Sequence, residues 1–159
     1  MNLLKPSDQK TSVTEIDPKN LLDKGIRNLI IDLEGTLVPR ETWAPAPETR
    51  EWIKGVKSAG LKIILLSNTI FFRRSKEISE NLGLPILCAA FKPLPFSFLK
   101  AVKLLSGSYS ETAVIGDQLF MDVLGGNLLG LHTILVKPIS TSKNPLRKFM
   151  RWMESRFVK

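Results

Sequence analysis

The sequence predicts an α/β fold in which a parallel five-stranded sheet lies between two layers of helices. Short, almost wholly apolar runs recur along the 159-residue chain, and segments with helical signals separate them. Runs that are apolar on both faces are typical of parallel strands, because helices then cover the sheet on both sides. The expected architecture is therefore a three-layer, Rossmann-like sandwich.

Five apolar runs are expected to form the strands, and each ends at a polar turn. They are residues 28–33, 61–66, 85–89, 112–115 and 132–136. Helices are expected between them. Asp17 and Pro18 form an N-cap and a first-turn proline, and Gly25 ends that helix. The others are expected from Pro47 to Gly60 and at residues 73–82, 93–105 and 119–129.

Composition excludes several classes of protein. Apolar residues make up 43% of the chain, which argues against disorder. Cys88 is the single cysteine, so no internal disulfide can form and a cytoplasmic location is expected. No signal peptide or membrane-spanning run is expected. The net charge of +8 favours anionic partners, namely nucleic acid, acidic lipid or a phosphorylated substrate, although solubility alone would also explain it.

Candidate functional residues follow the predicted strands. In a parallel α/β sheet, ligands bind beyond the carboxyl ends of the strands, so residues at those positions are expected to converge. After the first four strands come, in order, Asp32, Glu34 and Thr36; Ser67 and Asn68; Lys92; and Asp117 with Asp122.

These residue types fit a phosphoryl-transfer site. A carboxylate can attack phosphorus and form an acyl phosphate. Mg²⁺ held by carboxylates relieves the resulting charge repulsion, and Lys92 neutralises the nucleophile and the phosphate. Ser67, Asn68 and nearby backbone N–H groups can hold phosphate oxygens. Each residue alone is explained as well by a cap, a turn or a solvated charge; their shared position after strands favours the joint interpretation.

The same residues resemble the motifs of the haloacid dehalogenase superfamily of phosphatases. The Asp-x-Asp-x-Thr signature is matched from Asp32 to Thr36 with one departure, and the hydroxyl and lysine motifs are matched by Ser67 and Lys92. The Gly-Asp-x-x-x-x-Asp motif is matched by Asp117 and Asp122. Residues 17–136, above all GDQLFMDVLGGNLLGLHTILVKP, look like the YqeG-like group of type IIIA enzymes.

The resemblance implies a role for each residue. Asp32 is expected to be the phosphorylated nucleophile and a Mg²⁺ ligand. Asp117 and the backbone carbonyl of Glu34 are expected to be further ligands, with Asp122 as support. The remaining roles are acid and base for Glu34, phosphate positioning for Thr36, Ser67 and Asn68, and charge neutralisation for Lys92.

Glu34 is the departure from the motif, because family phosphatases usually have Asp there. Glu has the same carboxyl chemistry but reaches one methylene further, and about 1 Å of misplacement can cost roughly a hundredfold in rate. The sequence is thus compatible with a working acid/base in altered geometry. It is also compatible with a catalytically impaired phosphate- or nucleic-acid-binding module.

The substrate is expected to be large. Only one helix and one strand fit between Thr36 and Ser67, and again between Ser67 and Lys92, so no cap domain covers the site. An open site suits a phosphate on a protein, a nucleic-acid end or a lipid. The resemblance favours a lipid headgroup phosphate such as that of phosphatidylglycerophosphate; a phosphatase of soluble or protein-bound phosphate is the alternative. No nucleic-acid motif is present, and the sequence does not indicate an oligomeric state.

Residues 1–142 are expected to form the phosphatase domain, and residues 143–159 a basic amphipathic helix that belongs to the same domain or lies at its periphery. Asn144 and Pro145 form its N-cap and first turn. Such a helix is typical of a peripheral membrane contact, here on the inner face of the membrane, but its apolar face could equally pack on the domain. The apolar residues are Leu146, Phe149, Met150, Met153 and Phe157, with Trp152 at the border and Arg147, Lys148, Arg151, Arg156 and Lys159 flanking them.

Overall fold

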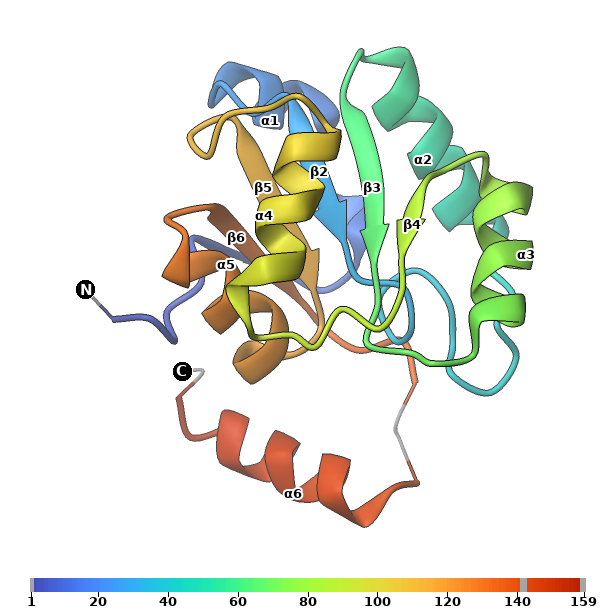
Figure 1. The fold of residues 1–159 in the computed structure, drawn as a ribbon, viewed down its shortest axis with the longest axis vertical. Coiled ribbons are helices and arrows are strands. Elements are labelled where there is room, and N and C mark those ends of the chain that lie inside the picture. The colour runs from blue at the N-terminus through green and yellow to red at the C-terminus, as the bar shows by residue number, and fades with distance from the viewer. Residues whose placement is uncertain (1, 141–142, 158–159) are drawn as a thin grey trace.

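The computed structural model describes residues 2–140 and 143–157 and contains one parallel sheet (Figure 1). The strand order is β1-β6-β5-β2-β3-β4, and every neighbouring pair is parallel. The strands are β1 (Asp8–Lys10), β2 (Asn28–Ile31), β3 (Lys62–Leu66), β4 (Ile86–Leu87), β5 (Thr112–Gly116) and β6 (His132–Val136).

The predicted parallel α/β sheet is confirmed, but it has six strands instead of five. The additional strand, β1, pairs with β6 at the edge of the sheet. Its three residues, Asp-Gln-Lys, are polar and only partly buried. An edge strand needs no apolar face on both sides, so no hydrophobic run marks it in the sequence.

The helices begin and end close to the predicted positions, with one exception. Asp17 and Asn144 cap their helices as expected, accepting hydrogen bonds from Lys19 N and Leu146 N, each at 2.9 Å. The predicted helix 119–129 instead begins as a π-helical turn, Leu119–Val123. The helices are α1 (Pro18–Asp23), α2 (Pro47–Ser58), α3 (Phe72–Leu82), α4 (Pro95–Leu104), α5 (Leu124–Leu128) and α6 (Pro145–Glu154).

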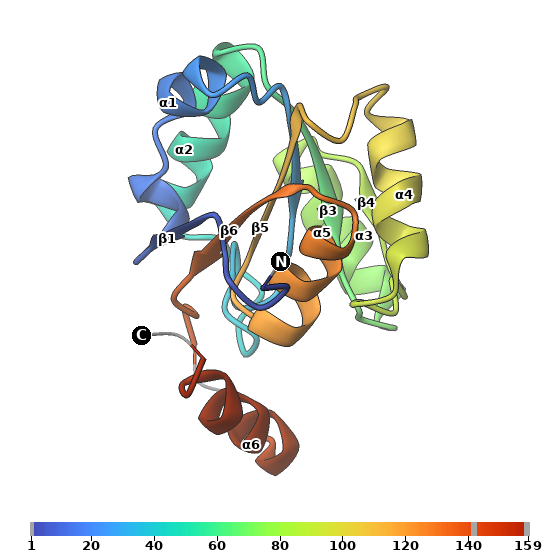
Figure 2. The ribbon, with the colours of Figure 1, turned by 90° about the vertical axis from the view of Figure 1, so that its left-hand side faces the viewer.

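The sheet separates two hydrophobic cores, because alternate residues of each strand point to opposite faces. In β2, Leu29 and Ile31 belong to the core that contains Trp52 of α2, whereas Ile30 belongs to the core that contains Phe98 of α4. Figure 2 shows α1 and α2 on one side of the sheet and α4 and α5 on the other. The predicted three-layer sandwich is therefore confirmed.

Helix α6 lies outside the three layers, beyond the carboxyl ends of the strands (Figure 1). Phe157, which follows it, contacts Phe120 edge to face, with ring centroids 6.0 Å apart. Lys159 and the side chain of Arg147, both assigned to its basic flanks above, lie outside the described residues. None of the described helices combines the length and the apolarity that crossing a bilayer requires.

Gly125 is a test of how tightly α4 and α5 pack. A Cβ at this position would lie 2.4 Å from Cε2 of Phe98, a fully buried ring. We expect Gly125→Ala to lower the free energy of unfolding by about 1–3 kcal/mol through overpacking, measured by urea denaturation. Gly55→Ala is the matched control, since a Cβ on this exposed position of α2 meets nothing within 4 Å. It should instead stabilise the protein by about 0.5–1 kcal/mol.

Candidate active site

The sheet brings Asp32 and Asp117 together because β2 and β5 are neighbours. The chain runs outward from β2 through β3 to β4, and then returns to β5 on the other side of β2. This reversal creates a topological switch point, where α/β sheets bind ligands. Asp32 directly follows β2, and its backbone N–H donates to the carbonyl of Ile115 at 2.9 Å. Asp117 directly follows β5, so both carboxylates start from the same crevice.

Lys92 connects three of the strand ends. Its ammonium lies 2.6 Å from Oδ1 of Asp32 and 2.7 Å from Oδ1 of Asp122, and it donates to the carbonyl of Leu66 at 3.0 Å. The lysine side chain is only 2% exposed. Burial alone would lower its pKa, but the carboxylates of Asp122 and Asp32 outweigh burial and raise the pKa above its ordinary value. Lys92 is thus a charged residue held between two acids.

Asp122 reaches the site through the π-helical turn after β5. Its carboxylate accepts a hydrogen bond from Gln118 N at 3.2 Å and packs directly on Gly116. A Cβ on Gly116 would lie 2.2 Å from the Asp122 carboxyl carbon, so only glycine allows this approach. The glycine of the Gly-Asp motif is therefore required by the second aspartate of the same motif.

Three buried carboxylates form a set of oxygen donors that could hold a metal ion. One oxygen each from Asp32, Asp117 and Asp122 lies within 4.8 Å of the others. Burial, followed by the negative charges of Asp32 and Asp122, raises the pKa of Asp117 to about 8, against the effect of two arginines. Burial likewise raises the pKa of Asp122 to about 6, although Lys92 opposes it. This repulsion is what a divalent cation would relieve, and the all-oxygen donor set suits Mg²⁺.

Thr36 lies between the two principal carboxylates. Its hydroxyl is 3.2 Å from Oδ2 of Asp32 and 3.3 Å from Oδ1 of Asp117. The preceding residue, Gly35, has a φ of +89°, and a Cβ there would lie 2.8 Å from Asp117. The glycine therefore lets the loop turn closely over the carboxylates and places the Thr36 hydroxyl between them.

Ser67 and Asn68 follow β3 as predicted and have different surroundings. The buried Ser67 hydroxyl lies 3.4 Å from Oε1 of Glu34 and accepts a hydrogen bond from Thr69 N at 3.1 Å. The Asn68 amide accepts from Lys92 N at 2.7 Å and donates to Lys92 O at 3.2 Å. Asn68 thereby fixes the loop that carries Lys92; its contact with substrate stays a prediction.

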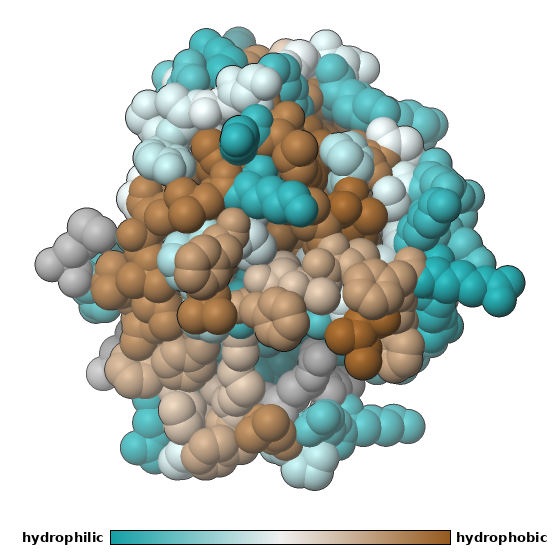
Figure 3. All heavy atoms as spheres, in the orientation of Figure 1, coloured by the Kyte–Doolittle hydropathy of each residue, from teal (hydrophilic) through white to brown (hydrophobic). Residues whose placement is uncertain are grey.

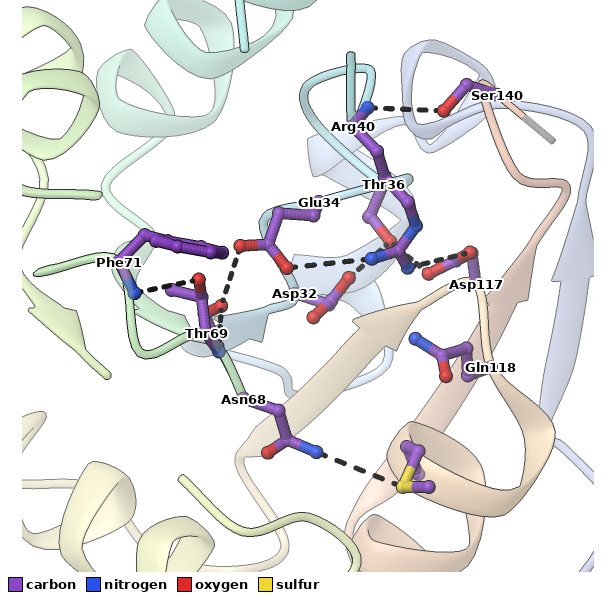
Figure 4. Close-up of polar contacts among 12 residues, drawn as sticks. Asp32, Glu34, Thr36, Arg40, Asn68, Thr69, Phe71, Asp117, Gln118 and Ser140 are labelled. Atoms are coloured by element: carbon purple, nitrogen blue, oxygen red, sulfur yellow. Dashed lines mark hydrogen bonds and ion pairs between the residues drawn. The ribbon is translucent and has the colours of Figure 1, made fainter. Parts of the chain in front are cut away.

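Glu34 points toward the loop after β3 (Figure 4). Its Oε2 lies 3.6 Å from the guanidinium of Arg40, which also lies 3.8 Å from Oδ2 of Asp117. Glu34 lines a pocket of about 350 Å³ together with Trp43, Asn68 and Phe71. The pocket is large enough to admit a phosphate group.

Two arginines of the site were not predicted from the sequence. Arg40 is largely buried, and its Nε has no hydrogen-bond partner among the described residues. Arg151, expected above among the basic residues that flank the apolar face of the C-terminal helix, donates to Oδ2 of Asp117 at 3.1 Å. No local pattern marks either residue, because only the loop after the first motif and the return of α6 bring them to the carboxylates.

The parallel sheet, its switch point and the cluster of aspartates and lysine define the class of protein as a phosphoryl-transfer enzyme. The comparisons agree: residues 9–130 match the family described as "Hydrolase: haloacid dehalogenase-like hydrolase". The chain belongs to this family, and it is a phosphatase. Residues 36–92, all of which are described, hold no cap domain.

Two curated relatives and one solved structure give further detail. The chain is 37% identical to "Probable phosphatase YqeG" of Bacillus subtilis over 96% of its length and 88% of that protein. It is 26% identical to "Phosphatidylglycerophosphate phosphatase 1, chloroplastic/mitochondrial" of Arabidopsis thaliana, over 82% of the chain but only 40% of that protein. A putative subfamily III A hydrolase from Legionella pneumophila has the same fold, with a TM-score of 0.55 and 20% identity over 76% of this chain and 69% of that chain.

Metal binding can be measured without turnover. We expect Mg²⁺ to stabilise the protein, by about 2.7 kcal/mol at a concentration near 100 times its Kd, and Asp117→Asn to remove this response. The apparent affinity should rise with pH toward about 8, because the ligands must be deprotonated and the pKa of Asp117 is raised to about 8. Thermal unfolding with and without Mg²⁺ tests both points. Asp23→Asn, on the exposed end of α1, is the control; an equal response in all three proteins would contradict this metal site.

Proposed function

We propose that the protein hydrolyses phosphomonoesters with Asp32 as the nucleophile. The observation that carries this proposal is the position of Asp32, whose two carboxylate oxygens contact Lys92 and Thr36 at the switch point. Asp32 would attack phosphorus, forming an acyl phosphate as the bond to the leaving oxygen breaks. Water would then attack this acyl phosphate, releasing inorganic phosphate and regenerating the Asp32 carboxylate.

Glu34 is proposed as the proton donor and acceptor of this reaction. As an acid it would protonate the leaving oxygen, and as a base it would take a proton from the incoming water. Its carboxylate lies beside Ser67 and Arg40, which hold it next to the pocket. These two contacts support the proposal that the longer side chain of Glu34 reaches a working position.

The cations of the site would hold the phosphate oxygens. Lys92, Arg40 and Arg151 all lie within 4 Å of a site carboxylate, and the buried Nε of Arg40 has no hydrogen-bond partner among the described groups. Asp32, Asp117 and the Glu34 backbone carbonyl are proposed to hold Mg²⁺, with Asp122 in support; when bound, Mg²⁺ neutralises charge on the transferring phosphoryl group. Thr36 and Ser67 are proposed to position phosphate oxygens.

The proposed substrate is a lipid headgroup phosphate, with phosphatidylglycerophosphate as the specific candidate. One support is the similarity to the Arabidopsis phosphatase named for that substrate. Another is the orientation of α6, whose Arg151 and Glu154 face the domain whereas Leu146, Phe149 and Trp152 are more than half exposed. An amphipathic helix with its apolar side outward suits contact with a membrane, and the proposed location is accordingly peripheral, on the inner face of a membrane.

Phosphate release tests the substrate and the nucleophile together. We expect release from phosphatidylglycerophosphate in mixed micelles to require Mg²⁺, to stop with chelator, and to exceed release from a soluble aryl phosphate. Asp32→Asn should abolish release from both substrates, because an amide oxygen is a poor nucleophile. Turnover of the aryl phosphate alone would favour a phosphatase of soluble or protein-bound phosphate. No turnover of either would favour a phosphate-binding module.

Glu34 can be tested by two substitutions. Glu34→Gln removes the ionisable proton and should lower kcat by on the order of 10²–10⁴-fold. Glu34→Asp keeps the acid but withdraws it from Ser67 and Arg40, and should cost roughly a hundredfold through misplacement. The measurement is kcat for the aryl phosphate. If Glu34→Asp raised activity from near zero, Glu34 would instead mark an impaired enzyme.

A further inference from the structure

Two loops beside the active site expose a group of large apolar side chains, here called the aromatic rim. Ile70, Phe71 and Phe72 come from the loop after β3 and the start of α3. Phe91, Leu94 and Phe96 come from the loop after β4 and the start of α4. The six residues range from 51% exposed for Leu94 to 73% exposed for Phe96. Exposed apolar side chains gathered in this way mark an interaction site.

The two halves of the rim form one surface. Ala89 N, which precedes Phe91, donates to Thr69 O at 3.0 Å, so the loops are hydrogen-bonded to each other. Figure 3 shows brown and tan atoms spread across the lower part of this face of the molecule, over the loops after β3 and β4 and on α6 below them. Between β4 and α4 the surface is hollowed into a groove of about 280 Å³, lined by Phe91, Leu94 and Phe96 and bordered by Lys100.

The exposed charges closest to the rim in sequence are mostly positive. Residues 52–76 and 81–110 contain no Asp or Glu, whereas Arg73, Arg74 and Lys100 are exposed next to the apolar side chains. The side chain of Arg73 is 94% exposed and lies 3.4 Å from Glu77 of α3. Aromatic and aliphatic side chains flanked by lysine and arginine suit the boundary between the acyl chains and the headgroups of an anionic bilayer. A second copy of this surface would instead bring like charges together.

The rim also borders the active site. Ile70 and Phe71 line the same pocket as Glu34 and Arg40. Across the site, α6 turns its own apolar residues outward, with Phe149 and Trp152 each 54% exposed and their rings stacked 5.9 Å apart. Apolar surfaces therefore lie on two sides of the position that the phosphate would occupy.

We propose that the aromatic rim is a bilayer-contact surface, which acts together with α6 to place the active site over lipid headgroups. This inference rests on the proposed function, since it assigns the rim to the lipid phase that carries the substrate. The aliphatic members of the rim and its apolar groove favour lipid over stacked nucleotide bases, which need aromatic platforms.

The test is binding to vesicles of phosphatidylcholine and phosphatidylglycerol, measured by sedimentation with the full chain. We expect Phe72→Gln/Phe96→Gln to lower the partition coefficient at least about tenfold, because each ring removed from water contributes about that factor. Both residues are exposed and lie outside the pocket of Glu34, so turnover of a soluble aryl phosphate should be unchanged. Phe149→Gln/Trp152→Gln should weaken vesicle binding independently.

The control is Leu104→Gln/Tyr109→Gln, at the opposite end of α4. Leu104 is 58% exposed, the same as Phe72, and Tyr109 is 46% exposed. This variant should bind vesicles as the unaltered protein does. Unchanged vesicle binding by Phe72→Gln/Phe96→Gln would overturn the proposal. The proposal would also be overturned if this variant kept vesicle binding and lost only self-association or the binding of a single-stranded oligonucleotide.

Failure of the proposed substrate gives a different result from failure of the rim. If the rim variant lost vesicle binding but the unaltered protein released no phosphate from phosphatidylglycerophosphate, the rim would be supported and the lipid substrate rejected. If lipid turnover were found but the rim variant retained both turnover and binding, the rim would be rejected and the lipid substrate supported.

Discussion

The buried charge of Lys92 is the constraint on which the site depends. Removing an ammonium group from water costs several kcal/mol unless opposite charges and hydrogen bonds replace the lost hydration. Here the replacement comes from Asp32, Asp122 and the carbonyl of Leu66, which belong to three different segments of the chain. The lysine can be buried only when the ends of β2 and β3 and the turn after β5 are all in place. Its burial therefore depends on the completed fold.

The strand order explains why these residues meet. Had the chain continued outward beyond β4 instead of returning beside β2, Asp117 and Asp122 would lie at the far edge of the sheet. The return places two acids next to Asp32, and like charges so close together are unfavourable without cations. Lys92 offsets part of this repulsion, and Arg40 and Arg151 offset more of it at Asp117. A site built from mutually repelling carboxylates is suited to a divalent cation, which would offset the negative charge of the carboxylates and of a phosphate.

The sequence predicts the parts of this arrangement that are locally encoded. Parallel strands read as short apolar runs, and motif residues follow them, so strands β2 to β6 and those motif residues could be located by pattern. Strand β1 could not be located in this way, because its three polar residues pair with β6 through backbone hydrogen bonds and form no apolar pattern. The π-helical turn was not predicted either, because no hydrophobic period distinguishes it from an α-helical turn; Asp122, which packs on Gly116, lies within it. Arg40 reaches the carboxylates through the fold of the loop after the first motif, and Arg151 through the return of α6, and neither path is marked by a local pattern.

Helix α6 shows how the same pattern can have opposite structural outcomes. Its apolar and basic faces are evident in the sequence, and the ordinary solution would bury the apolar face on the domain. The structure follows neither extreme: Arg151 donates to Asp117 and Glu154 accepts from Phe120 N, so these polar contacts lie inward, while Met150 and Met153 are partly buried. Among the described residues, Phe157 also contacts the domain through Phe120, while Phe149 and Trp152 stack on each other at the surface. Leaving these rings in water is unfavourable by the area they expose, and the inward ion pair holds the helix in that orientation. An apolar phase that covered the rings would remove this unfavourable exposure. The ion pair between Arg151 and Asp117 in the active site thus sets which side chains of α6 are exposed beside that site.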